Sequence, residues 1–133
     1  MDFSQIGLGT RAGILMIGGQ YATLCVERKK DEINLIYIES DGDGDRRNET
    51  VIERLSCIDT MEVYLKVQFN KEQTCVFFFS TDGVRWSQIK RKFSPKGAHW
   101  VGAKVGIFAI TDGSKEKEGY ADFSYLKVTA IEK

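Results

Sequence analysis

The sequence predicts an all-β fold, an antiparallel β-sandwich of the jelly-roll kind, and the middle of the chain carries the observations behind this prediction. From residue 61 to residue 69, apolar and polar residues alternate, which is the pattern of a strand with one buried face. An aromatic-rich run follows at 74–79, and Asp82-Gly83 then supplies the positive φ that a tight hairpin turn requires. A third strand is predicted over 84–89, and long helical periodicity is absent from the sequence.

Short apolar runs on either side of these hairpins predict further strands. They lie at 12–17, 21–28, 33–40 and 50–55 before the hairpins and at 104–110 and 120–129 after them. The run at 12–17 is continuously apolar, which fits a strand that is buried on both faces, with a short buried helix as the alternative. We expect the core between two packed sheets to contain Val63, Leu65, Val67, Phe77, Phe79, Val105, Ile107 and Phe123.

The composition predicts a single domain, residues 1–133, and excludes several classes of function. The 133 residues include 19 basic and 19 acidic side chains, so the formal net charge is zero and no strong field attracts nucleic acid or anionic lipid. No apolar run approaches the ~18 residues of a membrane helix. The first residues lack a signal-peptide pattern, and the sequence leaves the cellular location open.

Metal binding has weak support in the sequence. Asp41, Asp43 and Asp45 have the spacing of the first ligands of a calcium loop, but Arg46 and Ile52 stand where an EF-hand has glycine and its bidentate carboxylate. We therefore expect a hairpin loop here, with calcium as the alternative.

The three cysteines do not form a recognisable framework. Cys25, Cys57 and Cys75 contain no CxxC pair, and their odd number argues against a set of disulfides. We expect each to pack as a small hydrophobic residue.

Catalysis by this chain alone is not predicted. The sequence has no GxSxG motif, no glycine-rich phosphate loop and a single histidine, His99. Binding remains, and flat aromatic faces that stack on sugar rings are its natural carriers. The candidates for contact with a carbohydrate or a partner are Trp100, Tyr21, Tyr120 and Trp86.

These four aromatic residues have competing structural interpretations. Trp86 directly follows the Asp82-Gly83 turn and is expected to pack back over its hairpin as a core residue. Tyr21 and Tyr120 fit the faces of predicted strands equally well. Trp100 lies in a loop between polar residues and is the preferred binding candidate.

Four segments together resemble a known family. They read RAGILMIGGQYATL (11–24), FFFSTDGVRW (77–86), HWVGAKVGIFA (99–109) and GYADFSYLKV (119–128). In this order they resemble the concanavalin A-like β-sandwich at the C-terminus of family 43 glycoside hydrolases, the β-xylosidase and arabinofuranosidase type. The second segment alone is a weak signal, whereas the last two are specific.

The resemblance implies an accessory function. In this family the acidic catalytic groups belong to a five-bladed propeller that precedes the sandwich, so no catalytic residue carries over to this chain. The resemblance predicts a non-catalytic domain that packs on a catalytic propeller and contacts a plant-type glycan such as xylan or arabinan. Two alternatives are a stand-alone carbohydrate-binding module and a small glycosidase that acts by itself.

Two departures from the family pattern matter for the fold. The family's sandwich has further strands before the RAG segment, which here lies at Arg11. The final family motif reads like ADFDYF, whereas Ser124 and Leu126 replace its second acidic and last aromatic residue. Asp122 is retained and is a candidate cation ligand. The first departure predicts an uncovered sheet edge that pairs with a second copy of the chain or with a segment outside it.

Overall fold

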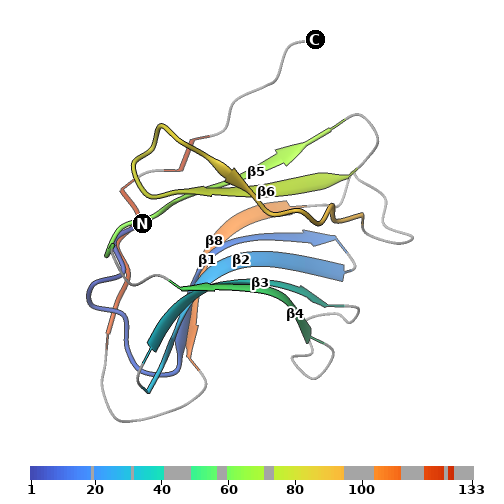
Figure 1. The fold of residues 1–133 in the computed structure, drawn as a ribbon. Helices are drawn as coiled ribbons and strands as arrows, with labels where there is room; N and C mark the ends of the chain where they lie inside the picture. The colour runs from blue at the N-terminus through green and yellow to red at the C-terminus, as the bar shows by residue number, and fades with distance from the viewer. Residues whose placement is uncertain are drawn as a thin grey trace.

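Two antiparallel sheets lie face to face in the computed structural model of this chain (Figure 1). The structure describes residues 1–18, 20–30, 32–40, 49–56, 60–70, 74–94, 104–111, 119–124 and 126–127. Strands are the only regular elements in these ranges, as the sequence predicts. None of these residues belongs to a helix that is long and apolar enough to cross a membrane.

The larger sheet contains five strands in the order β4-β3-β2-β1-β8. Consecutive strands β1 to β4 are hairpin neighbours, and β8 returns from the far end of the chain to pair antiparallel with β1. The bounds are β1 (Thr10–Gly18), β2 (Gln20–Lys29), β3 (Glu32–Ser40), β4 (Glu49–Ser56) and β8 (Lys104–Thr111). These five strands confirm the sequence prediction in this part of the chain.

The smaller sheet has the order β5-β6-β7 and comes from the predicted central hairpins. Its strands are β5 (Tyr64–Phe69), β6 (Cys75–Ser80) and β7 (Ser87–Gln88). The third strand is shorter than the predicted 84–89, because the chain bends through 81–85 before it pairs with β6.

The turn between β6 and β7 has the predicted backbone geometry. Gly83 has a φ of 80°, which confirms that the Asp82-Gly83 dipeptide places glycine in the left-handed region. The Asp82 carboxylate accepts hydrogen bonds from the amides of Val84 and Arg85, both at 2.8 Å. The hydroxyl of Ser80 accepts a bond from the Gly83 amide at 2.8 Å. Side chains at both ends of the turn therefore satisfy its backbone donors.

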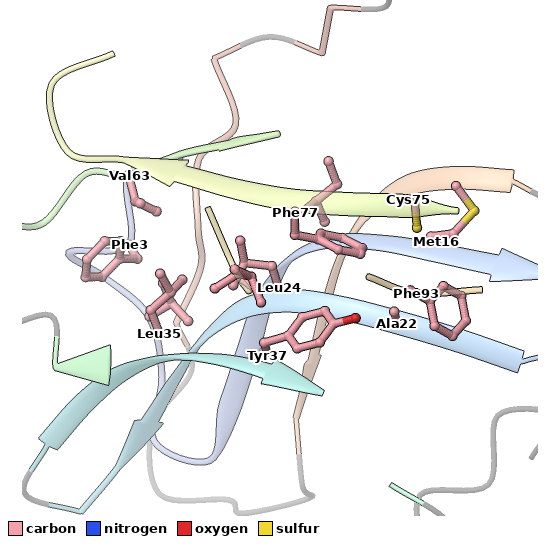
Figure 2. Close-up of a cluster of buried hydrophobic side chains, with 14 of the residues drawn as sticks. Phe3, Met16, Ala22, Leu24, Leu35, Tyr37, Val63, Cys75, Phe77 and Phe93 are labelled. Atoms are coloured by element: carbon pink, nitrogen blue, oxygen red, sulfur yellow. The ribbon is translucent and has the colours of Figure 1, made fainter. Parts of the chain in front are cut away.

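The core fills the space between the two sheets (Figure 2). Alternate residues of β1, β2 and β3 point into the core from the larger sheet. Residues of β6 point into it from the smaller sheet. The rings of Tyr37 and Phe77 meet at its centre, with centroids 5.4 Å apart and planes inclined by 53°. Labelled core residues are Phe3, Met16, Ala22, Leu24, Leu35, Tyr37, Val63, Cys75, Phe77 and Phe93.

Six of the eight predicted core residues lie in or against this core. Val63 and Phe77 are fully buried, and four others are partly buried against the cluster, namely Leu65, Val67, Phe79 and Phe123. The prediction is wrong for Val105 and Ile107, which are 40% and 43% exposed. Both point to the inner face, because they pair with the buried residues Met16 and Ile14. The smaller sheet contacts the larger one where β5 lies over β1. Strand β8 lies beside this contact at the edge of the larger sheet, so its inner residues stay exposed.

The predicted last strand at 120–129 is also wrong within the described residues 119–124 and 126–127. Asp122 forms only an isolated bridge with Asp2, through two backbone hydrogen bonds of 2.8 and 2.9 Å. The amide of Tyr120 donates to the carbonyl of Gln5 at 2.9 Å. The segment therefore adds to neither sheet and instead pairs with the N-terminal segment.

Candidate functional site

A hollow of about 230 Å³ lies on the face of the larger sheet that is turned away from the core. Because strand residues alternate between faces, the residues between the core positions of β1 and β2 point to this outer face. The accessible surface of the hollow is almost entirely apolar, and an ion-pair network borders it on one side. Its lining consists of Arg11, Leu15, Ile17, Tyr21, Thr23, Glu49, Phe108 and Ile110.

The apolar side comes from β1 and β8. Leu15 and Ile17 project outward from β1, and Phe108 and Ile110 project outward from β8 on the same face. The sequence predicts that β1 is buried on both faces, but only its inner residues are core residues, and Ile17 is 40% exposed. The second apolar face of this strand is therefore the floor of the hollow.

The polar side is an ion-pair network centred on Arg11. Its Nε donates to Glu27 Oε2 at 2.7 Å, and its Nη1 donates to Glu49 Oε1 at 2.9 Å. Arg54 Nη1 lies 3.7 Å from Glu27 Oε1. The side chains of Glu27 and Glu49 are only 5% and 11% exposed, so both carboxylates are held by pairing in a largely dry environment.

The network requires a curved sheet. Arg11 pairs in register with Glu27, whereas Glu49 is at the level of Tyr21, six residues away along β2. In a flat sheet this separation is roughly 20 Å, which exceeds the reach of the side chains. The strands bend with the smaller sheet on the outside of the bend (Figure 1), and the register shift after Tyr37 in the β3–β4 pair contributes to the curvature. The outer face is therefore concave, and Arg11 crosses it.

Tyr21 is the predicted binding residue that the structure brings to this hollow. Its hydroxyl donates to Glu49 Oε2. Burial, together with this bond to a carboxylate, raises the pKa of Tyr21 to about 12, so the phenol stays protonated and remains a donor. Burial alone would lower the pKa of Arg11, but its bonds to Glu27 and Glu49 raise it, so the guanidinium stays charged.

A second Tyr–Glu–Arg group provides an internal comparison. The hydroxyl of Tyr37 donates to Glu39 Oε2 at 2.8 Å, and Arg91 binds the same carboxylate through Nε and Nη2 at 3.0 and 2.9 Å. Both Tyr37 and Glu39 come from the inner face of β3. The two groups have the same chemistry, but only the one at Tyr21 borders the hollow.

The other aromatic candidates lie elsewhere. Tyr120 is 59% exposed and outside any strand. Trp86 is 37% exposed, which contradicts its expected place in the core, and its ring stacks on Lys66, whose Nζ lies 4.3 Å from the ring centroid. The same ammonium group lies 4.6 Å from the ring centroid of Phe78. Trp100 lies outside the described residues.

The candidate metal ligands do not assemble into a site in the part of the chain that is described. Asp41, Asp43 and Asp45 lie outside it. Asp122 is exposed and held by its bridge to Asp2, and no group of three or more His, Cys, Asp or Glu side chains is placed to hold a metal ion in the described ranges.

Two of the cysteines are buried and reduced, as the sequence predicts. Cys25 and Cys75 are both fully buried free thiols, and Cys57 lies outside the described residues. Burial raises the pKa of both described thiols to about 12, so they are not nucleophilic thiolates at neutral pH. They pack as small hydrophobic residues.

The sequence interpretation missed Arg11, Glu49 and Phe108. One signal was present: the run at 12–17 is apolar at every position, while the outward positions of β2 carry Tyr21, Thr23 and Glu27. Such a strand pair presents an apolar surface beside a polar one on the same face. The arrangement is an apolar hollow bordered by an ion-pair network whose members are bonded to one another.

A comparison with protein families decides the relationship. The sequence profile described as "Beta xylosidase C-terminal Concanavalin A-like domain", of glycoside hydrolase family 43, matches residues 1–129. The chain belongs to this family. The two-sheet fold and the family agree with the resemblance found in the sequence, and members of the family form the C-terminal part of family 43 enzymes.

Solved structures share the fold of this family 43 domain. A bifunctional GH43-CE protein from Bacteroides eggerthii aligns with a TM-score of 0.72 and 17% identity over 85% of this chain. A GH43 glycoside hydrolase engineered to display both endo-xylanase and exo-arabinofuranosidase activity aligns with a TM-score of 0.71 and 22% identity, also over 85%. The aligned part is only 15% and 25% of those two chains. No curated protein matches the sequence.

Proposed function

We propose that this chain is a non-catalytic accessory domain that packs on a family 43 catalytic domain and contacts its plant-type glycan substrate. The observation that carries the proposal is the family match over residues 1–129, together with solved relatives in which the corresponding domain is a minor part of a longer enzyme. The buried carboxylates Glu27 and Glu49 are consistent with a non-catalytic domain, because each is engaged by Arg11 in a structural ion pair.

The surface best suited to the catalytic domain is the uncovered inner face of β8. Val105 and Ile107 are large, apolar and exposed there, beside a strand edge with which no described strand pairs. An unpaired strand edge beside exposed apolar side chains favours contact with another protein surface. A catalytic domain in the same enzyme would be held next to it at high effective concentration.

The first test is the genetic context. The reading frame that contains this sequence, or a neighbouring one, is expected to encode a family 43 catalytic domain. Catalytic and accessory parts are then produced separately, and their association is followed by sedimentation and by the melting temperature of the catalytic part.

Ile107→Lys should weaken this association, since it places a charge in the apolar contact, whereas Lys66→Gln on the opposite sheet should not. The chain alone is expected to leave aryl β-xylosides and arabinosides uncleaved. Turnover by the pure chain, or association that is unchanged by Ile107→Lys, would contradict the proposal.

A further inference from the structure

We propose that the outer face of the smaller sheet binds an acidic glycan, through a uronic acid residue whose carboxylate pairs with lysine side chains. The inference rests on the proposed function, because it names the place and the ligand class of the glycan contact. The face consists of the side chains of β5, β6 and the chain around β7 that point away from the core, namely Lys66, Phe78, Trp86, Gln88, Lys90 and Lys92. It belongs to a different sheet from β8, the proposed surface for the catalytic domain.

An ammonium group lies over two aromatic rings on this face. The Nζ atom of Lys66 is 4.3 Å from the centroid of the Trp86 ring and 4.6 Å from the centroid of the Phe78 ring. Lys66 lies between two β5 residues that pack against the core, so it points outward, and Phe78 is its cross-strand partner. The two rings position the ammonium group and remove water from part of it, which strengthens its attraction for a carboxylate.

The segment that follows β7 adds two more lysines to this face. Ile89 and Phe93 are buried, and Arg91, midway between them, binds a carboxylate on the inner face of β3. These three side chains point inward, so the intervening Lys90 and Lys92 point outward, and both are exposed. The lysines of β5 and of this segment therefore place their positive charges on the same side of the smaller sheet.

This positive charge has no carboxylate partner among the described residues. The ion pairs in these ranges join arginines to glutamates, and none of them involves Lys66, Lys90 or Lys92. Asp82 is the nearest acidic residue along the chain, and its carboxylate is bonded within its own turn. A ligand that carries a carboxylate is therefore electrostatically complementary to this face.

Open ring surface and a free amide favour a sugar as the carrier of that carboxylate. Trp86 is 37% exposed and Val84 is 79% exposed, so apolar surface lies next to the charged groups. A pyranose uronate has an apolar C–H face for such a surface and a carboxylate at its edge. Gln88, the cross-strand partner of Phe78, is exposed, and its side-chain amide has no hydrogen-bond partner among the described residues. This amide can both donate to and accept from sugar hydroxyls.

The small number of charges disfavours two other classes of polyanion. Affinity for nucleic acid depends on how many phosphates the protein neutralises, and this face offers only the ammonium groups of Lys66, Lys90 and Lys92. The formal net charge of the whole chain is zero, so no long-range field attracts nucleic acid or an anionic membrane. A short acidic glycan is the better match for this face.

The test compares two oligosaccharides that differ only in charge. The first is a xylose oligosaccharide with a glucuronic acid branch, and the second is the same compound after reduction of its carboxyl group to an alcohol. We expect calorimetry to show binding of the first, and at least about tenfold weaker binding of the second, because the ion pairs are lost. Binding of the first should also weaken from about 10 mM to about 1 M NaCl, as the screening length falls from ~30 to ~3 Å.

NMR on the chain labelled with ¹⁵N locates the contact. The acidic oligosaccharide should shift the amide signals of β5, β6 and β7. Equal affinity for the two oligosaccharides, an absence of binding, or shifts confined to the hollow on the larger sheet would overturn the inference. Single-stranded DNA or phosphatidylglycerol vesicles that bind as tightly as the acidic oligosaccharide would also overturn the assignment to a glycan.

Charge variants make the test specific. Lys66→Gln should weaken binding of the acidic oligosaccharide by about tenfold, whereas Lys66→Arg keeps the charge and should stay within about threefold of the native affinity. The matched control is Lys29→Gln, which changes the net charge equally at an exposed lysine of the larger sheet and should leave the affinity within about twofold. Equal effects of Lys66→Gln and Lys29→Gln would overturn the inference.

An aromatic pair tests the ring surface. Trp86→Ala removes a ring that positions the Lys66 ammonium group and should weaken binding by about tenfold or more. Tyr120→Ala removes an exposed aromatic ring outside the strands and should leave the affinity unchanged. Thermal melting of both variants shows that they stay folded, and unchanged binding by folded Trp86→Ala would contradict the inference.

Failure of this inference is distinguishable from failure of the proposed function. Lys66→Gln should leave association with the catalytic domain unchanged, and Ile107→Lys should leave binding of the acidic oligosaccharide unchanged. If the catalytic domain associates and no oligosaccharide binds, the inference about the outer face fails and the accessory role stands. If the acidic oligosaccharide binds and no association occurs, the accessory role fails and the inference stands.

Discussion

At the scale of single residues, Asp82 shows how one side chain organises a turn. Its carboxylate accepts hydrogen bonds from the backbone amides of Arg85 and Val84 and from the hydroxyl of Ser80. These hydrogen bonds favour the ionised form of the carboxyl group. The bonds from Arg85 and Val84 are the main reasons why the pKa of Asp82 lies below 3.8 in the folded state. A depressed pKa means that folding is favoured by ionisation of this group.

This shift gives a prediction with a definite sign. The stabilisation from the Asp82 carboxylate should be fully present above its ordinary pKa of 3.8 and lost as the pH falls through the lower folded-state value. Asp82→Ala should therefore destabilise the protein at about pH 7, and the difference from the native protein should shrink at about pH 2. Urea unfolding at both pH values measures it, and a difference that grows in acid would contradict the prediction.

The two classes of predicted core residue give a second prediction. Phe77 is fully buried, so Phe77→Ala should lower the free energy of unfolding by about 3–5 kcal/mol through the cavity that it leaves. Ile107 is 43% exposed in the isolated chain, so Ile107→Ala should cost less than about 1 kcal/mol. Denaturant titrations of both variants provide the measurement. The titrations are run at a dilution at which the chain is monomeric, and a large loss for Ile107→Ala there would contradict the prediction.

At the scale of the elements, the hairpin of β1 and β2 depends on a close approach at Gly13. A Cβ atom at this position would lie 2.3 Å from the carbonyl oxygen of Leu24 and 2.6 Å from the Cα of Cys25. Both are backbone atoms, which cannot move without shifting the strand. The glycine is therefore required by the packing of the two strands.

Gly13→Ala should accordingly destabilise the protein by about 3 kcal/mol or more, since overpacking against backbone has no cheap relaxation. The matched control is Gly106→Ala on the same face of β8, where a Cβ would meet nothing within 4 Å. That control should be neutral or stabilising by up to about 1 kcal/mol. Thermal melting compares them, and equal effects would contradict the role assigned to the contact at Gly13.

Element by element, the sequence predicts strands and their faces better than it predicts what lies opposite them. Alternation correctly assigns the inner face of β5, because the direction of a side chain is a property of one strand. It fails for Val105 and Ile107, because alternation says which way a side chain points and not how far the other sheet extends. It also fails at 120–129, where an apolar pattern pairs with the N-terminal segment through a single bridge.

The candidate site shows the same limit. The sequence predicts Tyr21 as a binding candidate because aromatic residues stack on sugars, but Arg11 and Glu49, which lie beside it, are 38 residues apart in the chain. Their contact depends on the curvature of the larger sheet and on the bulge in the β3–β4 pair. No local pattern encodes that curvature, so the hollow could not be predicted from the sequence.

At the scale of the whole molecule, the two sheets have unequal width. The smaller sheet has three strands and the larger sheet has five, so the inner side of β8 remains uncovered in the described structure. The open side contains both an unpaired strand edge and apolar side chains, the combination that promotes association between chains. The described structure therefore has one open side at β8, where an unpaired strand edge lies beside exposed apolar side chains.

We expect the isolated chain to self-associate through this open side. Sedimentation over a range of concentrations should show dimers in equilibrium with the 15.0 kDa monomer. Ile107→Lys should shift the equilibrium towards the monomer by adding charge to the contact, while Tyr120→Lys, a change at an exposed position outside the strands, should not. A monodisperse monomer at high concentration would contradict this expectation.

The bridge between the two ends of the described chain has a consequence for motion. Asp2 is bridged on one side to Glu62 and on the other to Asp122, and the neighbouring Phe3 is fully buried. The N-terminal segment therefore lies between the segment at Glu62 and the segment at Asp122. When it detaches, both of these bridges are lost. In native-state hydrogen exchange, the amides of Asp2, Phe3, Val63 and Asp122 should therefore open together with one common free energy. This end of the sandwich would behave as a single cooperative unit whose opening can be measured separately from global unfolding.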